Sequence, residues 1–237
     1  MEINPVKQFY DKSYNQHGFG AQRKYPNEEL CRFMGRNFFS LPIHERREKK
    51  ILEVGCGSGA NLWMIAWEGF KAYGVDISDQ ALVLCQEMLD SYSVSATLKA
   101  QDMENLSFED NFFDAVVDVF SSYCLTQKEH ENFLQHVHRI LSPNGLFFSY
   151  FPSKRSDAYT NPGNVNFVDK DTLSGIVRSS SPFVGQDYNF RFMHPEEYKE
   201  NLINCGFQIS YLETVQRTYH NQTEQFEFIV IEARKPF

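Results

Sequence analysis

The chain has 237 residues, of which 42% are hydrophobic and 23% are charged. This composition is typical of a globular protein, and the length is sufficient to bury a core without disulfide bonds or a structural metal. The longest apolar runs, such as residues 114–120, are too short to cross a membrane. The formal net charge of −8 argues against a nucleic-acid partner, which would need a basic surface.

The five cysteines are widely spread and form neither a Cys-x-x-Cys motif nor the cysteine–histidine spacing of a zinc site. We therefore expect reduced thiols, no bound metal and a cytoplasmic protein. The first seven residues also lack the basic-then-apolar order of a secretory signal. The 22 phenylalanines and 12 tyrosines predict either a dense aromatic core or an aromatic-lined pocket.

Apolar runs alternate with amphipathic stretches through the middle of the chain, which predicts βαβ units on a parallel sheet. The expected strands are residues 50–55, 72–76, 96–101, 113–120 and 146–151. One helix is expected at 79–92, with Ser78 as its cap. Another begins at Thr126, where TQKE has the form of a capping box, and is expected to stop at the Pro-Asn-Gly run of residues 143–145.

We predict a single domain with four parts. They are a helical, aromatic cap (1–45), the core of the sheet (46–152), an insert or lid (153–193), and a C-terminal helix with a hairpin (194–237). The insert is rich in Pro, Gly, Asn and Ser and has one helix expected at 169–179. A stretch that long between regular elements is typical of a lid or a binding segment.

The C-terminal part predicts a helix at 195–205 followed by two long strands at 207–218 and 224–234. The turn between these strands is short and polar, so we expect an antiparallel hairpin rather than another βαβ unit. All the expected elements together predict an α/β fold with a doubly wound, mostly parallel seven-stranded sheet.

The most specific local pattern is a glycine-rich turn after the first expected strand, in the run ILEVGCGSGANL of residues 51–62. Gly55 and Gly57 allow a tight turn and a close approach to a ligand, and the helix that follows offers free N–H groups. A plain strand–helix turn without a ligand is one alternative. Gly55, Gly57 and Ala60 also satisfy the dinucleotide pattern GxGxx(G/A), with Asp76 at a suitable distance for a ribose-binding acid.

Two acids favour a different ligand. Glu53 stands two residues before the first glycine, where its carboxylate would repel a pyrophosphate and attract an ammonium or sulfonium group. Asp102 ends the third strand and is followed by Met103, and a polar group beside an apolar one suits the edge and face of an adenine. The C-terminal hairpin is also foreign to the plain dinucleotide-binding fold.

With these features the sequence resembles the class I S-adenosylmethionine-dependent methyltransferases, most closely their small-molecule branch called methyltransferase type 11. Five motifs carry the resemblance in order: EVGCGSG (53–59), GVDIS (74–78), QDM (101–103), FFDAVV (112–117) and RILSPNGL (139–146). The last motif has Asn144 where the family more usually has glycine. The resemblance covers residues 51–151 and leaves both ends of the chain without specific motifs.

The resemblance implies S-adenosylmethionine as the cofactor, S-adenosylhomocysteine as its product, and no metal. The binding residues are expected at the carboxyl ends of the strands, where ligands of open α/β sheets lie. They are Glu53 at the methionine amino group, Gly55, Cys56 and Gly57 beneath it through their backbone, Asp76 on the ribose, Ile77 against the adenine, Asp102 and Met103 at the adenine edge, and Phe120 on the methionine side. Helix capping is the alternative role for Asp76 and Asp102.

The acceptor site is expected under a mobile cover made by the aromatic N-terminal segment and the insert. Tyr10, Tyr14 and Tyr25 could face the cofactor or a cationic acceptor, with simple packing on the sheet as the alternative. Methyl transfer mainly requires donor and acceptor to be held at attack distance. A general base is needed only if the nucleophile arrives protonated.

Basic residues after the fifth strand are candidates for binding an anionic acceptor. Lys154, Arg155 or Arg191 could hold a phosphate or a carboxylate, unless they are solvated surface charges. His194 is a candidate catalytic base, as are Tyr14 and Tyr25. Its position before Pro-Glu-Glu, however, favours the N-cap of the last helix.

The sequence thus predicts a methyltransferase acting on a small molecule, with neither a nucleic-acid nor a membrane partner. After Phe120 the fourth strand runs into SSY and lacks the (Asp/Asn)-Pro-Pro-(Tyr/Phe) run that resembling enzymes use on nucleobase amino groups. An NAD-dependent oxidoreductase and a non-catalytic S-adenosylmethionine-binding protein are the alternatives. The acceptor atom is not specified by any of these motifs.

Overall fold

The computed structural model describes residues 4–237 and contains a seven-stranded sheet in the order β3-β2-β1-β4-β5-β9-β8. The strands are β1 (Lys50–Val54), β2 (Lys71–Asp76), β3 (Ala96–Ala100), β4 (Phe113–Val119), β5 (Leu141–Pro152), β8 (Gln208–Tyr219) and β9 (Glu224–Arg234). Neighbours among the first five strands are parallel, whereas β9 runs antiparallel to both β5 and β8. The predicted mostly parallel sheet and its C-terminal hairpin are confirmed.

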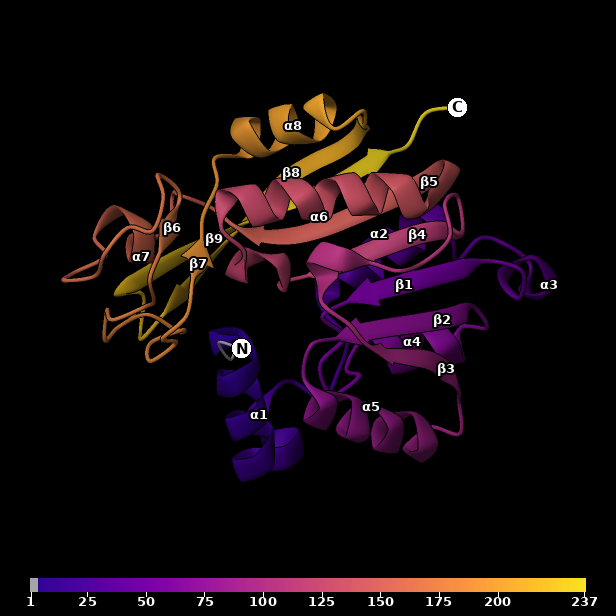
Figure 1. Ribbon diagram of the computed structural model, residues 1–237, viewed down its shortest axis with the longest axis horizontal. Helices are drawn as coiled ribbons and strands as arrows, with labels where there is room; N and C mark the ends of the chain where they lie inside the picture. The colour runs from indigo at the N-terminus through magenta and orange to yellow at the C-terminus, as the bar shows by residue number, and fades with distance from the viewer. Residues whose placement is uncertain (1–3) are drawn as a thin grey trace.

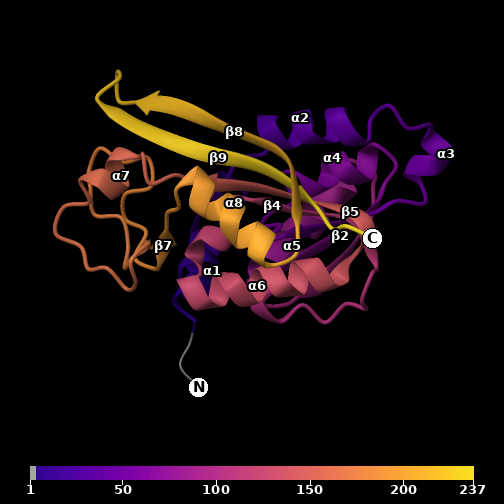
Figure 2. The same cartoon turned by 90° about the horizontal axis from the view of Figure 1, so that it is seen from above.

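Helices cover both faces of this sheet (Figure 2), with α2 and α4 on one face and α6 and α8 on the other. The helices are α1 (Pro5–His17), α2 (Glu28–Asn37), α3 (Ile43–Arg46), α4 (Leu62–Trp67), α5 (Asp79–Ser91), α6 (Gln127–Ile140), α7 (Asp157–Thr160) and α8 (Pro195–Asn204). Short 3-10 helices are η1 (Gly18–Ala21), η2 (Met103–Asn105) and η3 (Ser122–Cys124). No helix within residues 4–237 combines the length and apolar character needed to span a bilayer.

Phenylalanines fill the space between the sheet and its helices. Phe33 of α2 stacks on Phe148 of β5 with ring centres 4.9 Å apart, and on the other face Phe133 of α6 lies 6.1 Å from Phe147. All four side chains are fully buried. Part of the aromatic excess therefore serves the core, since buried aromatic rings contribute large apolar areas.

Two local expectations are wrong. The Pro-Asn-Gly run does not separate helix from strand, because β5 already begins at Leu141 and pairs with Phe113 ahead of a register shift. The helix expected at 169–179 is absent within the described residues. Instead Asp169 accepts hydrogen bonds from Asp171 N and Thr172 Oγ1, which folds the chain into a turn before the short strand β6 (Thr172–Leu173).

The chain order creates a switch point at the centre of the sheet. Strands β1 and β4 are neighbours, and the chain continues from β1 toward one edge and from β4 toward the other. Figure 1 shows α1 and the insert of residues 153–193, with α7 and β7 (Phe190–Arg191), beyond the carboxyl ends of the central strands. Ligands of open α/β sheets bind at such a position.

The hairpin holds the insert in place. Arg178 Nε of the insert donates to Glu224 Oε2 of β9 over 2.7 Å, and Ser153 Oγ donates to Glu227 Oε1 over the same distance. Both carboxylates are buried. The C-terminal strand therefore supports the sheet and the insert together.

Candidate functional site

Two adjoining cavities lie at the carboxyl ends of the strands, with volumes of about 410 Å³ and 210 Å³. Gly55, Asp76, Ile77 and Met103 line both, so the cavities are continuous at these residues. The predicted cofactor residues found only in the larger cavity are Glu53, Cys56 and Phe120, and the one found only in the smaller cavity is Asp102. The fold thus brings these predicted cofactor residues together, although they come from four different strand ends.

Glu53 is a buried carboxyl group with one oxygen left over. Its Oε1 accepts a hydrogen bond from Asn61 Nδ2 over 2.5 Å, whereas Oε2 has no hydrogen-bond partner among the described residues. Burial raises the pKa of Glu53 to about 8, against the opposing effects of the Asn61 hydrogen bond and the positive charge of Arg23. A cation placed beside Oε2 would stabilise the ionised form.

The glycine loop is built around the Asp76 carboxylate. Its Oδ2 accepts from Gly57 N over 2.8 Å and its Oδ1 from Ser78 N over 2.9 Å, while burial raises its pKa. The sequence predicts free N–H groups at the start of a helix in this loop. The structure differs, because α4 starts only at Leu62 and the Gly57 N–H donates to Asp76. Gly57 itself does not line either cavity.

Gly55 has a positive φ of 64°, and a Cβ there would lie 2.5 Å from Ser121 Cβ. A side chain at this position would therefore meet both backbone strain and a steric clash. The glycine lets β1 and the segment after β4 approach each other at the floor of the site.

The alternative role of Asp102 as a cap is also present in the structure. Asp102 Oδ1 accepts from Glu104 N over 3.0 Å and so caps η2. The same residue and Met103 line the smaller cavity, which leaves the cap compatible with contact to a ligand. Burial, followed by the nearby charges of Glu129 and Asp102, raises the pKa of Glu104 to about 7.

Phe120 directly follows β4 in a left-handed conformation, with φ of 59°. This conformation is uncommon for a bulky residue and is found where surrounding contacts enforce it. The buried Asp118 supplies such contacts, since it accepts from Ser121 N over 3.1 Å and from Ser122 N over 3.0 Å. The resulting turn places the Phe120 ring 4.9 Å from Phe183 of the insert.

The N-terminal segment and the insert both contribute to the wall of the larger cavity. Tyr10 and Tyr14 of α1 line it, as does Phe183 of the insert. Helix α1 is fastened to the cofactor side by Lys7, whose Nζ donates to the carbonyl oxygen of Ile77 over 2.9 Å. Both segments of the predicted cover therefore border the larger cavity.

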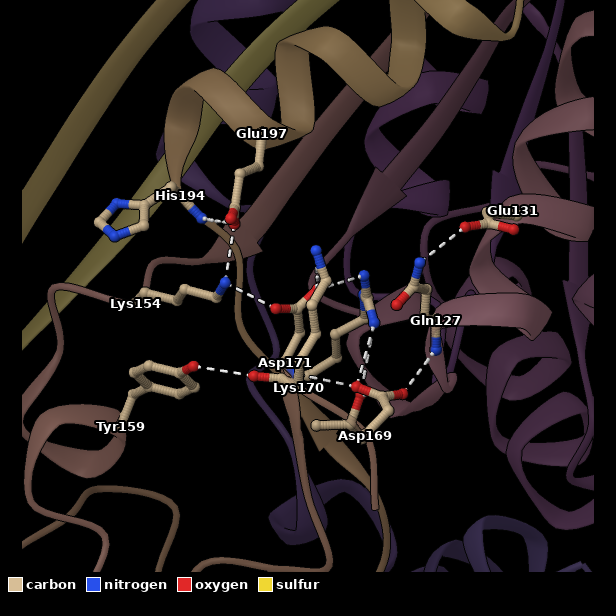
Figure 3. A network of polar contacts seen from close by, with 11 residues as sticks. Gln127, Glu131, Lys154, Tyr159, Asp169, Lys170, Asp171, His194 and Glu197 are labelled. Atoms are coloured by element: carbon tan, nitrogen blue, oxygen red, sulfur yellow. Dashed lines mark hydrogen bonds and ion pairs between the residues drawn. The ribbon is translucent and has the colours of Figure 1, made fainter. Parts of the chain in front are cut away.

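Two basic candidates for acceptor binding are placed elsewhere. Lys154 Nζ lies 2.6 Å from Asp171 Oδ1 and 2.7 Å from Glu197 Oε2 (Figure 3). The buried Arg191 donates to Asp171 Oδ2 over 2.9 Å. Neither side chain lines a cavity. Both charges are paired with acids of the insert and of α8, which does not favour the predicted role in binding an acceptor.

Three further candidates lie outside both cavities. Tyr25 is 65% exposed, and Arg155 Nη1 lies 3.6 Å from Glu227 Oε1. His194 caps α8, where its backbone N–H donates to Glu197 Oε2 over 3.2 Å. The structure therefore gives His194 its alternative role and supplies no site for it as a base.

Several side chains of the larger cavity are not among the predicted site residues, and Arg23, Asn61 and Tyr123 are the ones with a clear role in the site. Asn61 orients Glu53 and was part of the quoted glycine-loop run. Tyr123 follows Phe120 by three residues, so its nearness to the end of β4 was a usable signal. Arg23 is the cation that lines this cavity among residues 4–237, and no local pattern indicates it.

The same described range contains no group of three or more His, Cys, Asp or Glu side chains arranged to hold a metal ion. The arrangement is instead a cleft with two carboxyl groups at its floor and aromatic rings at its roof. Together with the sheet order, this defines a Rossmann-like α/β protein with a cleft at its switch point, the position where ligands of open α/β sheets bind.

Comparison with known proteins identifies the family. The family model described as "Methyltransferase domain" matches residues 51–145. YqeM of Bacillus subtilis (strain 168), which carries a provisional methyltransferase name, is 30% identical over 210 residues, covering 78% of this chain and 84% of YqeM. The chain belongs to the class I S-adenosylmethionine-dependent methyltransferases.

Two further comparisons show how varied the similar proteins are. The tRNA N(3)-methylcytidine methyltransferase trm140 of Schizosaccharomyces pombe is 28% identical over 148 residues, which are 59% of this chain and 46% of that protein. The crystal structure of an S-adenosylmethionine-dependent methyltransferase from Methanosarcina mazei superposes with a TM-score of 0.68 at 22% identity, covering 82% of this chain and 97% of that one. The latter likeness supports the fold.

Proposed function

We propose that this enzyme transfers the methyl group of S-adenosylmethionine to a small molecule held between the cofactor, α1 and the insert. The observation that carries the proposal is the buried Glu53 carboxyl group, which lines the larger cavity and whose Oε2 has no hydrogen-bond partner among the described residues. A carboxylate there suits the ammonium group of an amino acid and opposes a pyrophosphate, which counts against the NAD alternative.

The residues of the cavity fit the cofactor part by part. Glu53 would bind the ammonium group and Arg23 the carboxylate of the methionine moiety, since these opposite charges line the same cavity. Asp76 has lone pairs beyond those used by Gly57 and Ser78, and these would accept from the ribose hydroxyls. Asp102 and Met103 in the smaller cavity would contact the adenine.

When bound, S-adenosylmethionine supplies an electrophilic methyl group on a sulfonium. The protein's part is to hold an acceptor in line with it and to exclude water. Phe120, Tyr123 and Phe183 provide an aromatic wall for that purpose, and Tyr10 and Tyr14 of α1 also line the cavity.

Cofactor binding is tested by calorimetry with S-adenosylhomocysteine. Asp76→Ala is expected to abolish binding without unfolding the protein, because it removes the ribose acceptor and a contact of the glycine loop. The exposed Asp90→Ala on α5 is the matched control and should bind like the wild type. Unchanged affinity in Asp76→Ala would contradict the proposed cofactor site.

The acceptor class is tested with methyl-labelled S-adenosylmethionine and two acceptor pools, a small-molecule extract and bulk tRNA. The net charge of −8 and the enclosed aromatic wall favour the small-molecule pool. Label in tRNA alone would replace the small-molecule proposal with the activity for which trm140 is named. Cofactor binding without label in either pool would favour a non-catalytic binding protein.

A further inference from the structure

Three tyrosine hydroxyl groups meet above the cofactor cavities. The hydroxyl of Tyr10 lies 3.1 Å from that of Tyr123 and 3.0 Å from that of Tyr188, and the last two are 2.6 Å apart. Each comes from a different part of the chain, Tyr10 from α1, Tyr123 from η3 and Tyr188 from the insert. We call this arrangement the tyrosine triangle.

The tyrosine triangle lies where the two cavities adjoin. Tyr10 and Tyr123 line the larger cavity and Tyr188 lines the smaller one. The Tyr123 ring centre is 4.4 Å from that of Phe120, the residue at the carboxyl end of β4. The hydroxyls therefore form a polar spot within an otherwise aromatic wall.

Among the described residues, the larger cavity offers no carboxyl group, histidine or lysine beyond those assigned to the cofactor, whereas Asp102, Glu104, Glu129 and Asp187 line the smaller cavity. Among residues 4–237 the carboxyl groups that line the larger cavity are Glu53 and Asp76, and both are assigned to the cofactor. No histidine or lysine of the described chain lines it. Burial raises the pKa of all three triangle phenols, so their hydroxyls stay protonated and act as donors.

The spacing of the triangle suits a fourth oxygen. Three hydroxyl oxygens separated by 2.6 to 3.1 Å define the base of a near-regular tetrahedron, whose apex lies at hydrogen-bonding distance, about 2.8 Å, from each of them. An acceptor oxygen at that apex could receive up to three hydrogen bonds, because each phenol has one proton to donate. The three phenolic hydrogens, which otherwise bond within the tyrosine triangle, would then point toward this oxygen.

We propose that the tyrosine triangle is the subsite that holds an oxygen atom of the methyl acceptor, and that this acceptor arrives as an oxyanion, a phenolate or an enolate. This inference rests on the proposed methyltransferase function. The flat aromatic rings of Phe120 and Phe183, 4.9 Å apart, suit a planar, conjugated anion beside the hydroxyls.

An anionic acceptor needs no general base. A lone pair of the acceptor forms the new bond to the methyl carbon, while the electron pair of the broken S–C bond stays on sulfur and gives a neutral thioether. The acceptor's negative charge and the sulfonium's positive charge cancel, and no proton is transferred. The triangle then serves as a positioning and specificity element for the negatively charged oxygen.

The probe for the test is 4-nitrophenolate, whose visible absorbance distinguishes the anion from the neutral phenol. It is titrated into the enzyme saturated with S-adenosylhomocysteine, with neutral 4-nitroanisole as the comparison ligand. We expect the enzyme to bind the anion selectively and to lower the probe's apparent pKa. Tyr123→Phe and Tyr188→Phe should each weaken anion binding by about tenfold to hundredfold, as expected for a hydrogen bond to a charged group.

Tyr211→Phe is the matched control, since Tyr211 lies on β8 outside both cavities. Each triangle variant is also titrated with S-adenosylhomocysteine. Binding like that of the wild type shows that the variant is folded, and Tyr10→Phe replaces a variant that fails this check. Equal binding of 4-nitroanisole, anion affinity unchanged in the variants, or no anion binding by the wild type would overturn the inference. Failure of the wild type to bind S-adenosylhomocysteine would instead contradict the proposed function.

Discussion

Replacing Glu53 by glutamine should make the cofactor-free protein more stable and the cofactor complex weaker. Burial raises the pKa of this carboxyl group from 4.5 to about 8, which corresponds to a cost of about 5 kcal/mol for keeping it ionised in the folded state. Glutamine has nearly the same shape and can still accept from Asn61 without carrying the charge. At pH 9 we expect Glu53→Gln to raise the free energy of unfolding by a large part of that amount.

The effect should depend on pH in a defined direction. Below pH 4.5 the group is protonated in both the folded and the unfolded state, so the substitution changes little. Between pH 4.5 and about 8 the unfolded chain loses the proton while the folded protein keeps it, and the wild type loses stability as the pH rises. The difference between variant and wild type should therefore grow through this window and level off above pH 8.

Cofactor affinity should depend on pH in the opposite direction, rising with pH while the stability of the wild type falls. An ammonium group beside Oε2 requires the ionised carboxylate, so wild-type affinity for S-adenosylhomocysteine should fall by up to about tenfold per pH unit below pH 8. Glu53→Gln should bind weakly at every pH. Urea unfolding and calorimetry across pH 5 to 9 measure both effects.

Glu29→Gln on α2 is the control for these measurements, because Glu29 is also a buried acid but lines neither cavity. It should leave the affinity and its pH dependence intact. A Glu53→Gln variant with wild-type stability at pH 9, or with an unchanged pH profile of binding, would contradict the role assigned to the Glu53 carboxylate.

Three other substitutions have distinct expected outcomes. Lys154→Met leaves the buried Asp171 short of a partner and should cost about 3 kcal/mol in urea unfolding, with cofactor affinity unchanged. In Gly55→Ala the new Cβ would clash with Ser121 at a residue whose φ is positive. Calorimetry should show S-adenosylhomocysteine binding about tenfold or more weaker than in a wild-type titration under the same conditions. Burial lowers the pKa of His130 to about 3, so below pH 6.5 the unfolded chain binds a proton at this residue whereas the folded protein does not. The free energy of unfolding of the wild type should therefore fall by about 2 kcal/mol between pH 7 and 5. That of His130→Phe should fall by less over the same range in urea unfolding.

The parts of the fold that sequence could predict are those fixed by nearby residues. The burial of β1, the Ser78 cap of α5 and the Thr126 capping box are local, and each is present in the structure. The candidate cofactor positions follow from the same logic, since a residue at the carboxyl end of a parallel strand must face the switch point. Glu53 and Asp76 are placed there by strand boundaries alone.

The roles of the basic residues could not be predicted in this way, because their partners are distant in sequence. Lys154 pairs with Asp171 and Glu197, and Arg191 with Asp171, through turns that carry no periodic pattern. The tyrosine triangle has the same origin, as its three members lie far apart along the chain. Such contacts exist only once the insert has folded against the sheet.

The position of β9 has a consequence for the order in which parts of the protein fold during synthesis. This last strand pairs between β5 and β8, so the hydrogen-bonding edge of β5 stays uncovered while the insert, α8 and β8 leave the ribosome. The strands at the floor of the cofactor cavity can pair before β9 is made, because the motifs from Glu53 to Met103 precede β9 in the chain. The wall that receives the acceptor is fastened only when Glu224 and Glu227 arrive, so a growing chain would acquire its cofactor site before its substrate selectivity.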